Sequence, residues 1–380
     1  MIYLDNNSTT PLDPEIIEVM MPWLTKNFSN ADSPNSMGRL AHNAIENARS
    51  EVATLLASHP KNIFFTASAT EANNTILKGY AFRLNQQAKI YISGIEHSSI
   101  KETVAFMVAN SMVSSTTLGV DSCGKVILPE SIEKNALLSV IAASNVLHTI
   151  NDLSALSHCA SHYEAFFHTD ATQLLGKRKF SLDNLNIDAV SFSGHKIYGP
   201  KGVGVMYLSD KFKQHAFSPL LHGGKQEGRV RAGTLNVANI VGIGKACSLI
   251  SAKLDKEMSN LEQLSSLFLN HLKDANINYI LNGHSRDRLP GGLNLSFPGI
   301  NGHLLIETLA NCAISQGSAC DETGTASYIF DAINKKDLAE FSVRIQFGRF
   351  NTTEDAQHGA DMLIKTIVQL KKDIGGTYRP

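Results

Sequence analysis

The sequence predicts an α/β protein, in which a large domain with a mainly parallel sheet is followed by a smaller α+β domain. Two observations lead to this prediction. Short apolar runs alternate with amphipathic stretches through the first two thirds of the chain, a pattern typical of βαβ units. With 380 residues, 43% hydrophobic and 18% charged, the chain is also long enough for two domains with sizeable cores.

The strands of the large domain are expected at short apolar runs without helical spacing, which lie at residues 89–93, 138–144, 165–169, 189–193 and 203–208. Helices are expected before and between these runs, at residues 37–57, 98–110 and 153–163. Strands that alternate with helices in this way form largely parallel sheets that are buried on both faces.

The pattern changes after about residue 250. A long amphipathic helix is expected over residues 256–274, because leucine and phenylalanine recur there at helical spacing. Strands at 291–298 and 341–347 and a closing helix at 356–371 follow. We therefore expect a large domain of residues 15–255 and a small domain formed by residues 1–14 and 256–380.

Charge and cysteine usage narrow the class of protein. The 34 basic and 35 acidic residues nearly cancel, so direct nucleic-acid binding is not expected. The first residues do not resemble a secretory leader, and we find no apolar run of the roughly 18–20 residues that cross a membrane. The five cysteines lack CxxC spacing, which argues against a disulfide framework and a zinc cluster. A cytoplasmic protein with reduced thiols and no metal site is expected.

The segment SFSGHKIYGPKGVG, at residues 191–204, follows an expected strand and carries Lys196 into a glycine-rich turn. It does not contain the GxxxxGK[ST] pattern of a nucleotide-binding loop. One interpretation is an ordinary surface lysine. The other is a lysine that forms a Schiff base with an aldehyde cofactor, while Ser193 and His195 donate hydrogen bonds to the cofactor phosphate.

A second polar segment, HTDATQ at residues 168–173, ends the preceding strand. Pyridoxal phosphate needs a carboxylate beside its ring nitrogen, and Asp170 suits that role. Gln173 could bond the phenolic oxygen of the same ring. An aspartate in this position is otherwise often a helix cap, but an aspartate and a lysine on successive strand ends favour the cofactor interpretation.

Two weaker signals point to the same cofactor. TASATEANN, at residues 66–74, opens a helix whose backbone N–H groups, with the Thr70 hydroxyl, would hold a phosphate. The alternative there is a plain helix cap. His97 follows another expected strand and could stack on the pyridine ring, although a lone histidine is more often structural.

Together these motifs resemble those of cysteine desulfurases of the NifS/IscS type, within the class V aminotransferase-like enzymes. The resemblance spans nearly the whole chain, through YLDNNSTTPLDP at 3–14, ATEANN, EH, HTDATQ, SFSGHKIYGPKGVG, RAGTLN, GSAC and RIQFGRF at 344–350. It implies the type I fold of pyridoxal-phosphate-dependent transferases, with a mainly parallel seven-stranded sheet in the large domain.

The resemblance also implies roles for the matching residues. Lys196 would hold pyridoxal 5'-phosphate covalently, and His97 would stack on its ring. Asp170 would contact the ring nitrogen, and Gln173 and Asn145 the phenolic side. The residues implied to hold the phosphate are Ala69, Thr70, Ser193 and His195, with Thr234 reaching the phosphate of a neighbouring subunit in a homodimer. Arg344 and Asn145 would bind the substrate, because a guanidinium group pairs well with a carboxylate.

Cys320, in the segment SQGSAC, matches the catalytic cysteine of the family. The implied reaction converts L-cysteine to L-alanine. The sulfur is held as a persulfide on Cys320 and passed to an acceptor protein of iron–sulfur cluster assembly or tRNA thiolation, while Lys196 and His97 move protons. Small residues around Cys320 are expected to form a flexible loop. The alternatives are a selenocysteine lyase, another class V lyase, or a regulatory homologue with degraded catalysis.

The chain departs from the family pattern in four places. SNVLH at 144–148 keeps Asn145 but lacks the usual glutamate and glycine, NADSPNS at 30–36 lacks a histidine, and HGGKQEGR at 222–229 also differs. Asp321 and Glu322 follow Cys320, and carboxylates close to a thiol raise its pKa. These departures leave the cofactor residues intact but leave the acceptor, the turnover rate and the substrate open.

Overall fold

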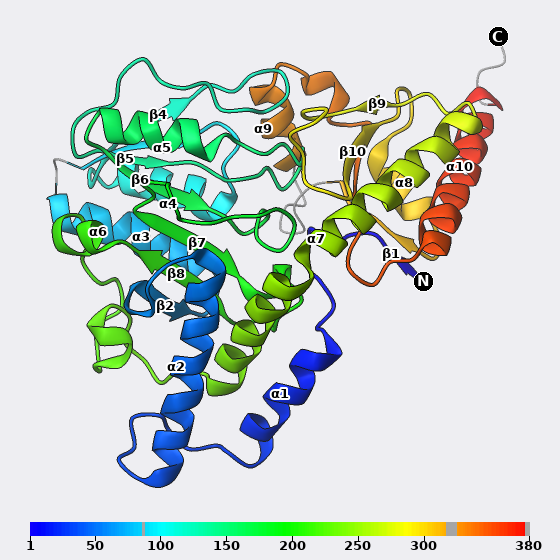
Figure 1. Ribbon diagram of the computed structural model, residues 1–380. Helices are drawn as coiled ribbons and strands as arrows, with labels where there is room; N and C mark the ends of the chain where they lie inside the picture. The colour runs from blue at the N-terminus through cyan, green and yellow to red at the C-terminus, as the bar shows by residue number, and fades with distance from the viewer. Residues whose placement is uncertain (86–87, 317–324, 377–380) are drawn as a thin grey trace.

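The computed structural model describes residues 1–85, 88–316 and 325–376. A seven-stranded sheet lies at its centre, with the order β2-β8-β7-β6-β5-β3-β4 (Figure 1). In that order the strands are Ile63–Thr66, Gly204–Leu208, Ala189–Ser193, Phe166–Asp170, Leu137–Ser139, Lys89–Ser93 and Ser114–Leu118. β8 runs antiparallel to both neighbours, and the remaining pairs are parallel. The expected α/β class with a mainly parallel seven-stranded sheet is confirmed.

Helices cover both faces of this sheet. Consecutive strand residues point to opposite sides, and both sets are apolar, so each face has to be buried. Phe65 and Phe167 belong to one core, and their neighbours Phe64 and Phe166 belong to the other. The first core is completed by α1 (Pro14–Thr25), α2 (Ser36–Leu56), α5 (Leu153–His162) and part of α7 (Val237–Asp274). The second is completed by α3 (Ala69–Leu84), α4 (Ser98–Ala109) and α6 (Asp210–His215).

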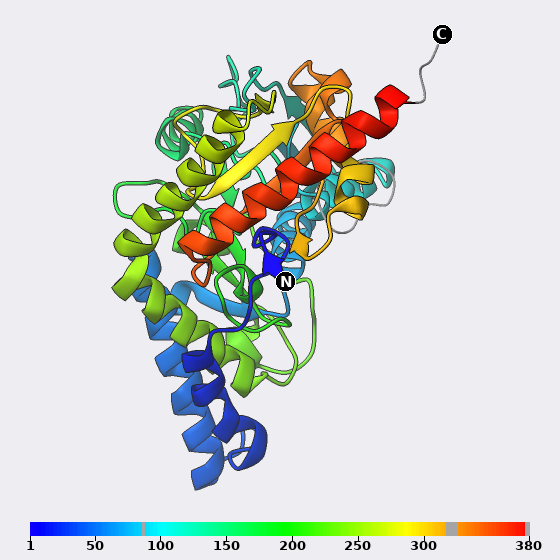
Figure 2. The ribbon, with the colours of Figure 1, turned by 90° about the vertical axis from the view of Figure 1, so that its right-hand side faces the viewer.

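A separate core surrounds an antiparallel three-stranded sheet of the order β12-β10-β9, with the bounds Ser342–Gln346, Gly292–Ser296 and Ile280–Leu281. The second half of α7 packs there with α8 (Gly302–Thr308) and α10 (Thr353–Gly376), and Figure 2 shows α10 on the side that faces the viewer. α9 (Thr325–Ala332) contributes to a smaller cluster. Near the N-terminus, β1 (Ile2–Tyr3) pairs with β11 (Cys312–Ala313). The division into residues 15–255 and residues 1–14 with 256–380 stays a prediction, which the separate cores favour.

α7 belongs to both cores. Its 38 residues span about 57 Å; Ile243 and Ile250 lie in the large core, and Leu261 and Phe268 lie in the small one. By length and composition alone α7 could cross a membrane, since one window has a mean hydropathy of 1.3. Half of that window is buried in the fold, so intramolecular packing accounts for much of its apolar surface.

Two expected element boundaries are wrong. α7 begins at Val237 and not at residue 256. Its first half contains Gly244, where an added Cβ would lie 2.6 Å from Ala48 Cα of α2, so close helix packing overrides the weak helix propensity of glycine. β5 ends at Ser139 and not at residue 144, because the chain turns back on itself and the Ser144 N–H donates to the Thr149 carbonyl.

A buried ion pair anchors the segment between α6 and α7. Arg49 of α2 donates to both carboxylate oxygens of Glu227, at 2.7 and 2.8 Å, and the Phe65 N–H of β2 donates to the same carboxylate at 2.7 Å. Further along this segment, Thr234 is exposed. The ion pair therefore attaches the segment that carries Thr234 to the edge of the large sheet.

Candidate active site

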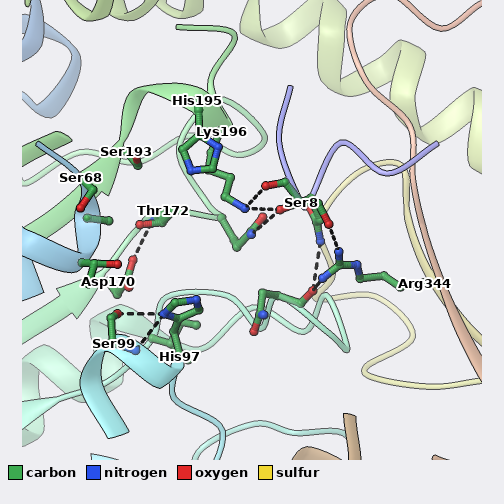
Figure 3. A pocket seen from close by; sticks show the side chains of 16 residues that line it. Ser8, Ser68, His97, Ser99, Asp170, Thr172, Ser193, His195, Lys196 and Arg344 are labelled. Atoms are coloured by element: carbon green, nitrogen blue, oxygen red, sulfur yellow. Dashed lines mark hydrogen bonds between the residues drawn. The ribbon is translucent and has the colours of Figure 1, made fainter. Parts of the chain in front are cut away.

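One cavity of about 210 Å³ gathers residues from distant parts of the chain at the carboxyl ends of the strands (Figure 3). Ten of the twelve site residues expected from the sequence line it: Ala69, Thr70, His97, Asn145, Asp170, Gln173, Ser193, His195, Lys196 and Arg344. Thr234 is exposed and is not among the described residues that line the cavity. Cys320, with Asp321 and Glu322, lies outside the described residues.

Lys196 follows β7 in a short turn, η3 (Gly194–Lys196). The turn is tight, since a Cβ at Gly194 would lie 2.8 Å from the Pro200 carbonyl oxygen. Lys196 Nζ donates to the carbonyl oxygens of Asn7 and Ser8, the latter at 2.7 Å. The amine is therefore held at the cavity wall by the N-terminal segment, which closes the cavity on that side.

Asp170 ends β6 and is almost fully buried. Its carboxylate accepts the Thr172 N–H at 2.9 Å and the Asn73 side-chain N–H at 2.8 Å. Asn73, from α3, also donates to Ser99 Oγ at 2.9 Å and accepts from Ser191 Oγ. Every hydrogen-bonding group of this amide is used, so Asn73 fixes the carboxylate in place.

The His97 ring caps α4 through Nδ1, which accepts the Ser99 N–H at 3.1 Å and lies 2.8 Å from Ser99 Oγ. Since Nδ1 is an acceptor, the neutral ring carries its hydrogen on Nε2. Burial lowers the pKa of His97; Asp170 opposes this shift and Lys196 adds to it. His97 is therefore a neutral aromatic ring on the cavity wall near Asp170 (Figure 3).

The phosphate-binding group expected from the sequence lies at one end of the cavity. Ala69 and Thr70 form the first turn of α3, where N–H groups have no intrahelical acceptor. β8 approaches this turn so closely that a Cβ at Gly204 would lie 2.4 Å from the Ser68 carbonyl carbon. Burial lowers the pKa of the nearby His195 to about 4, and Lys196 adds to the shift, so His195 is neutral at pH 7.

Arg344, on β12, forms the opposite end and is 1% exposed. Its guanidinium donates to Asp5 Oδ1 at 2.9 Å, to Ser8 Oγ at 2.6 Å and to the Asn145 carbonyl at 2.9 Å. Arg344 Nε has no hydrogen-bond partner among the described residues. The N-terminal residues therefore hold Arg344 as well as Lys196.

Several polar residues at the cavity are not among the site residues expected from the sequence: Asn7, Ser8, Ser99 and Thr172, with Asn73 behind Asp170. The motifs YLDNNSTT and ATEANN contain three of them, but only as parts of a resemblance. Small polar residues give no periodic signal in a sequence. The one feature that points to these residues is that several asparagines and serines stand close to the motif residues.

The residues present fit pyridoxal phosphate. Three buried oxygens at the cavity have no partner among the described residues, namely Asn7 Oδ1, Asn145 Oδ1 and Thr172 Oγ1, and buried polar atoms are normally satisfied. An amine, a buried carboxylate, an aromatic ring and a helix N-terminus line the same space. They match, in order, the aldehyde, the ring nitrogen, the ring face and the phosphate of that cofactor.

Beneath this cavity, Glu96 is a fully buried acid. Its Oε1 accepts from Ser93 Oγ and from the Ile141 N–H, and its Oε2 has no partner among the described residues. Burial raises the pKa of Glu96 to about 8, although the two hydrogen bonds oppose the shift. Glu96 is therefore mostly protonated in the folded protein at pH 7.

The protonation of Glu96 predicts a pH-dependent stability. The unfolded chain releases this proton near pH 4.5 and the folded chain near pH 8, so the free energy of unfolding falls as the pH rises through that window, by at most about 1.4 kcal/mol per pH unit. Glu96→Gln mimics the protonated acid and should remove this component. Urea denaturation at pH 5.5 and pH 8 measures it, with the exposed Glu102→Gln as control. Equal pH dependence in wild type and Glu96→Gln would contradict the shift.

Comparison with known proteins gives one consistent result. Residues 2–358 match the family model described as Aminotransferase class-V. The chain is 38% identical to the cysteine desulfurase IscS of Dictyoglomus turgidum, over 97% of this chain and 95% of that protein. It is 35% identical to a mitosomal cysteine desulfurase of Trachipleistophora hominis, over 97% of this chain and 87% of that protein.

Solved structures agree with these relatives. A NifS-like protein superimposes with a TM-score of 0.90 at 31% identity, covering 97% of this chain and 99% of that one. A structure described as SspA in complex with cysteine superimposes with a TM-score of 0.80 at 30% identity, covering 93% of this chain and all of that one.

Proposed function

The chain belongs to the class-V aminotransferase family, as a cysteine desulfurase of the NifS/IscS type, and from this premise we propose that it converts L-cysteine to L-alanine with the sulfur kept as a persulfide on Cys320. The enzyme depends on pyridoxal phosphate. One observation carries the assignment of the site: Lys196, Asp170 and His97 stand at or after the ends of three different strands and line one cavity.

The residues that would hold the cofactor divide by the part they contact. Lys196 would bind the aldehyde carbon through Nζ, Asp170 would keep a proton on the ring nitrogen, and His97 would cover the ring face. Gln173 and Asn145 would contact the phenolic side. Ala69, Thr70, Ser193 and His195 would hold the phosphate.

When bound, pyridoxal phosphate supplies an electron sink for the negative charge that forms at the substrate α-carbon. Arg344 orients L-cysteine by its carboxylate, because a guanidinium group pairs with both oxygens. The Lys196 amine removes the α-proton, with Asn7 and Ser8 holding Nζ in place. His97 donates its Nε2 hydrogen toward the cavity, with Nδ1 fixed by Ser99.

The sulfur transfer uses the Cys320 thiolate. It attacks the sulfur of L-cysteine, so that a sulfur–sulfur bond forms and the carbon–sulfur bond breaks. The electron pair of the broken bond passes to the carbon skeleton, which takes up a proton and leaves as L-alanine. The products are L-alanine and a persulfide on Cys320, and a thiol of the acceptor then takes the outer sulfur. An acceptor protein of iron–sulfur cluster assembly or tRNA thiolation fits this chemistry.

A homodimer in which Thr234 reaches the partner's cofactor phosphate is part of the proposal. Exposed apolar side chains gather on α1, α2 and the segment between them: Ile17, Met21, Leu24, Phe28, Met37 and Leu40. The segment that carries Thr234 adjoins them, since Gln226 donates to Asp32 at 2.6 Å. An apolar patch of this kind favours a protein interface.

We also propose that the protein works in a reducing compartment such as the cytoplasm, because the four described cysteines are unpaired.

The test is an assay of purified protein with pyridoxal phosphate, L-cysteine and a reductant, in which alanine and sulfide are followed. Wild type should produce both in equal amounts, and Cys320→Ala should lower the rate of sulfide release by roughly 100-fold or more. The matched control is Cys123→Ala, which removes a partly exposed cysteine. Equal sulfide release by wild type and Cys320→Ala would overturn the persulfide role, and turnover of L-selenocysteine alone would favour a selenocysteine lyase.

A further inference from the structure

Lys177 is a buried lysine that the proposed reaction does not use. It lies four residues after Gln173 and is 5% exposed. Its Nζ donates to the backbone oxygen and to the side-chain Oε1 of Gln173, both at 3.3 Å. No carboxylate within residues 1–85, 88–316 and 325–376 forms an ion pair with Lys177.

A buried ammonium without an acidic partner is costly. Burial lowers the pKa of Lys177 to about 7, and the positive charges of Lys196 and Arg344 shift it in the same direction. A neutral residue of similar size would avoid this cost. The presence of a lysine at this buried position therefore needs an explanation that depends on its amine. The hydrogen bonds of Gln173 provide that explanation.

The Gln173 amide is oriented from both sides. Its Oε1 accepts from Lys177 Nζ, which has no acceptor site when charged, and its Nε2 donates to the Asn7 carbonyl at 3.1 Å, which only accepts. A reversed amide would place its oxygen against the Asn7 carbonyl oxygen, and its nitrogen against the charged form of Lys177. Nε2 carries a second hydrogen, which is not used by Asn7. Gln173 can therefore donate this hydrogen to a group bound in the cavity.

The same contacts extend to Lys196. The Asn7 carbonyl that accepts from Gln173 also accepts from Lys196 Nζ. Lys177, Gln173, Asn7 and Lys196 thus form a continuous hydrogen-bonded series, with Lys177 behind the cavity wall and the others at the cavity.

We propose that Lys177 is a positioning residue, which holds the Gln173 amide with its nitrogen toward the cavity and so supplies a donor for an ionised oxygen of the bound group. The inference rests on the proposed function, because the oxygen concerned is the phenolic oxygen of pyridoxal phosphate. Lys177 itself does not touch the cofactor and acts through Gln173.

The absorption spectrum of the bound cofactor tests this inference without any measurement of turnover. The bound cofactor absorbs at long wavelength when its phenolic oxygen is ionised and at shorter wavelength when that oxygen carries the proton. Lys177→Met should lower the ratio of the long- to the short-wavelength band at least two-fold at pH 7.5. Lys177→Leu is a second replacement should methionine pack badly. Lys179→Met is the control, because Lys179 is exposed and pairs with the surface residue Asp255.

A double substitution separates positioning from a direct effect of charge. Gln173→Leu should shift the spectrum in the same direction, and adding Lys177→Met to it should change the spectrum no further. Additive shifts, or a Lys177→Met spectrum equal to that of wild type, would overturn the inference while the proposed function stands. A wild-type protein that fails to take up pyridoxal phosphate would overturn both.

Discussion

Lys196→Ala should lower the rate of alanine formation from L-cysteine by roughly 10⁴-fold or more. The lysine has two proposed roles, since its amine holds the cofactor and removes the α-proton, and loss of a general base alone costs roughly 10²- to 10⁴-fold. Nζ donates to the carbonyl oxygens of Asn7 and Ser8, which are backbone atoms and remain when the side chain is shortened. The backbone of the cavity should therefore survive the substitution.

Two measurements check this result. Reduction with borohydride followed by mass spectrometry should leave the cofactor mass on wild type and not on Lys196→Ala. The control is Lys201→Ala, an exposed lysine in the same glycine-rich segment, which should keep both the covalent cofactor and the rate. A cofactor mass retained on Lys196→Ala would show that another amine holds the group.

Glu227→Ala should destabilise the fold by about 3–5 kcal/mol, because removal of one partner leaves a buried charge without compensation. Glu227 has a fully buried side chain that binds Arg49 at two points and the Phe65 N–H at a third. The midpoint of urea denaturation measures the loss.

Glu46→Ala is the matched control for Glu227→Ala. Glu46 contacts the same guanidinium at 3.1 Å, but its side chain is 45% exposed, and exposed pairs contribute about 0–1 kcal/mol. A similar loss of stability in the two variants would mean that burial does not govern this ion pair.

The sequence predicts the fold best where a motif coincides with an element boundary. α4 begins at Ser98 as expected because His97 caps it, and β7 is found at the expected residues. The start of α7 could not be predicted, because Gly242 and Gly244 weaken the local helix signal while α1 and α2 supply the stabilising contacts.

The residues of the site also differ in how far the sequence predicts them. Lys196 and Asp170 could be identified from the sequence because each stands in a motif at a strand end. The roles of Asn73 and Asn7 could not, because each depends on a partner that the fold brings near. Asn73 and Asp170 lie 97 positions apart, and Gln173 and Asn7 lie 166 positions apart. A linear pattern cannot report such pairings.

The contact between Asp5 and Arg344 also fixes an order of events during synthesis. The two residues are separated by 339 positions, so at roughly 5–20 residues per second the ribosome adds Arg344 about 17–70 s after Asp5. Throughout that interval the nascent N-terminal segment lacks the strand that it finally joins. Because Arg344 lines the cavity, the cavity is complete only after β12 has been synthesised, and a chain truncated before β12 would lack one end of it.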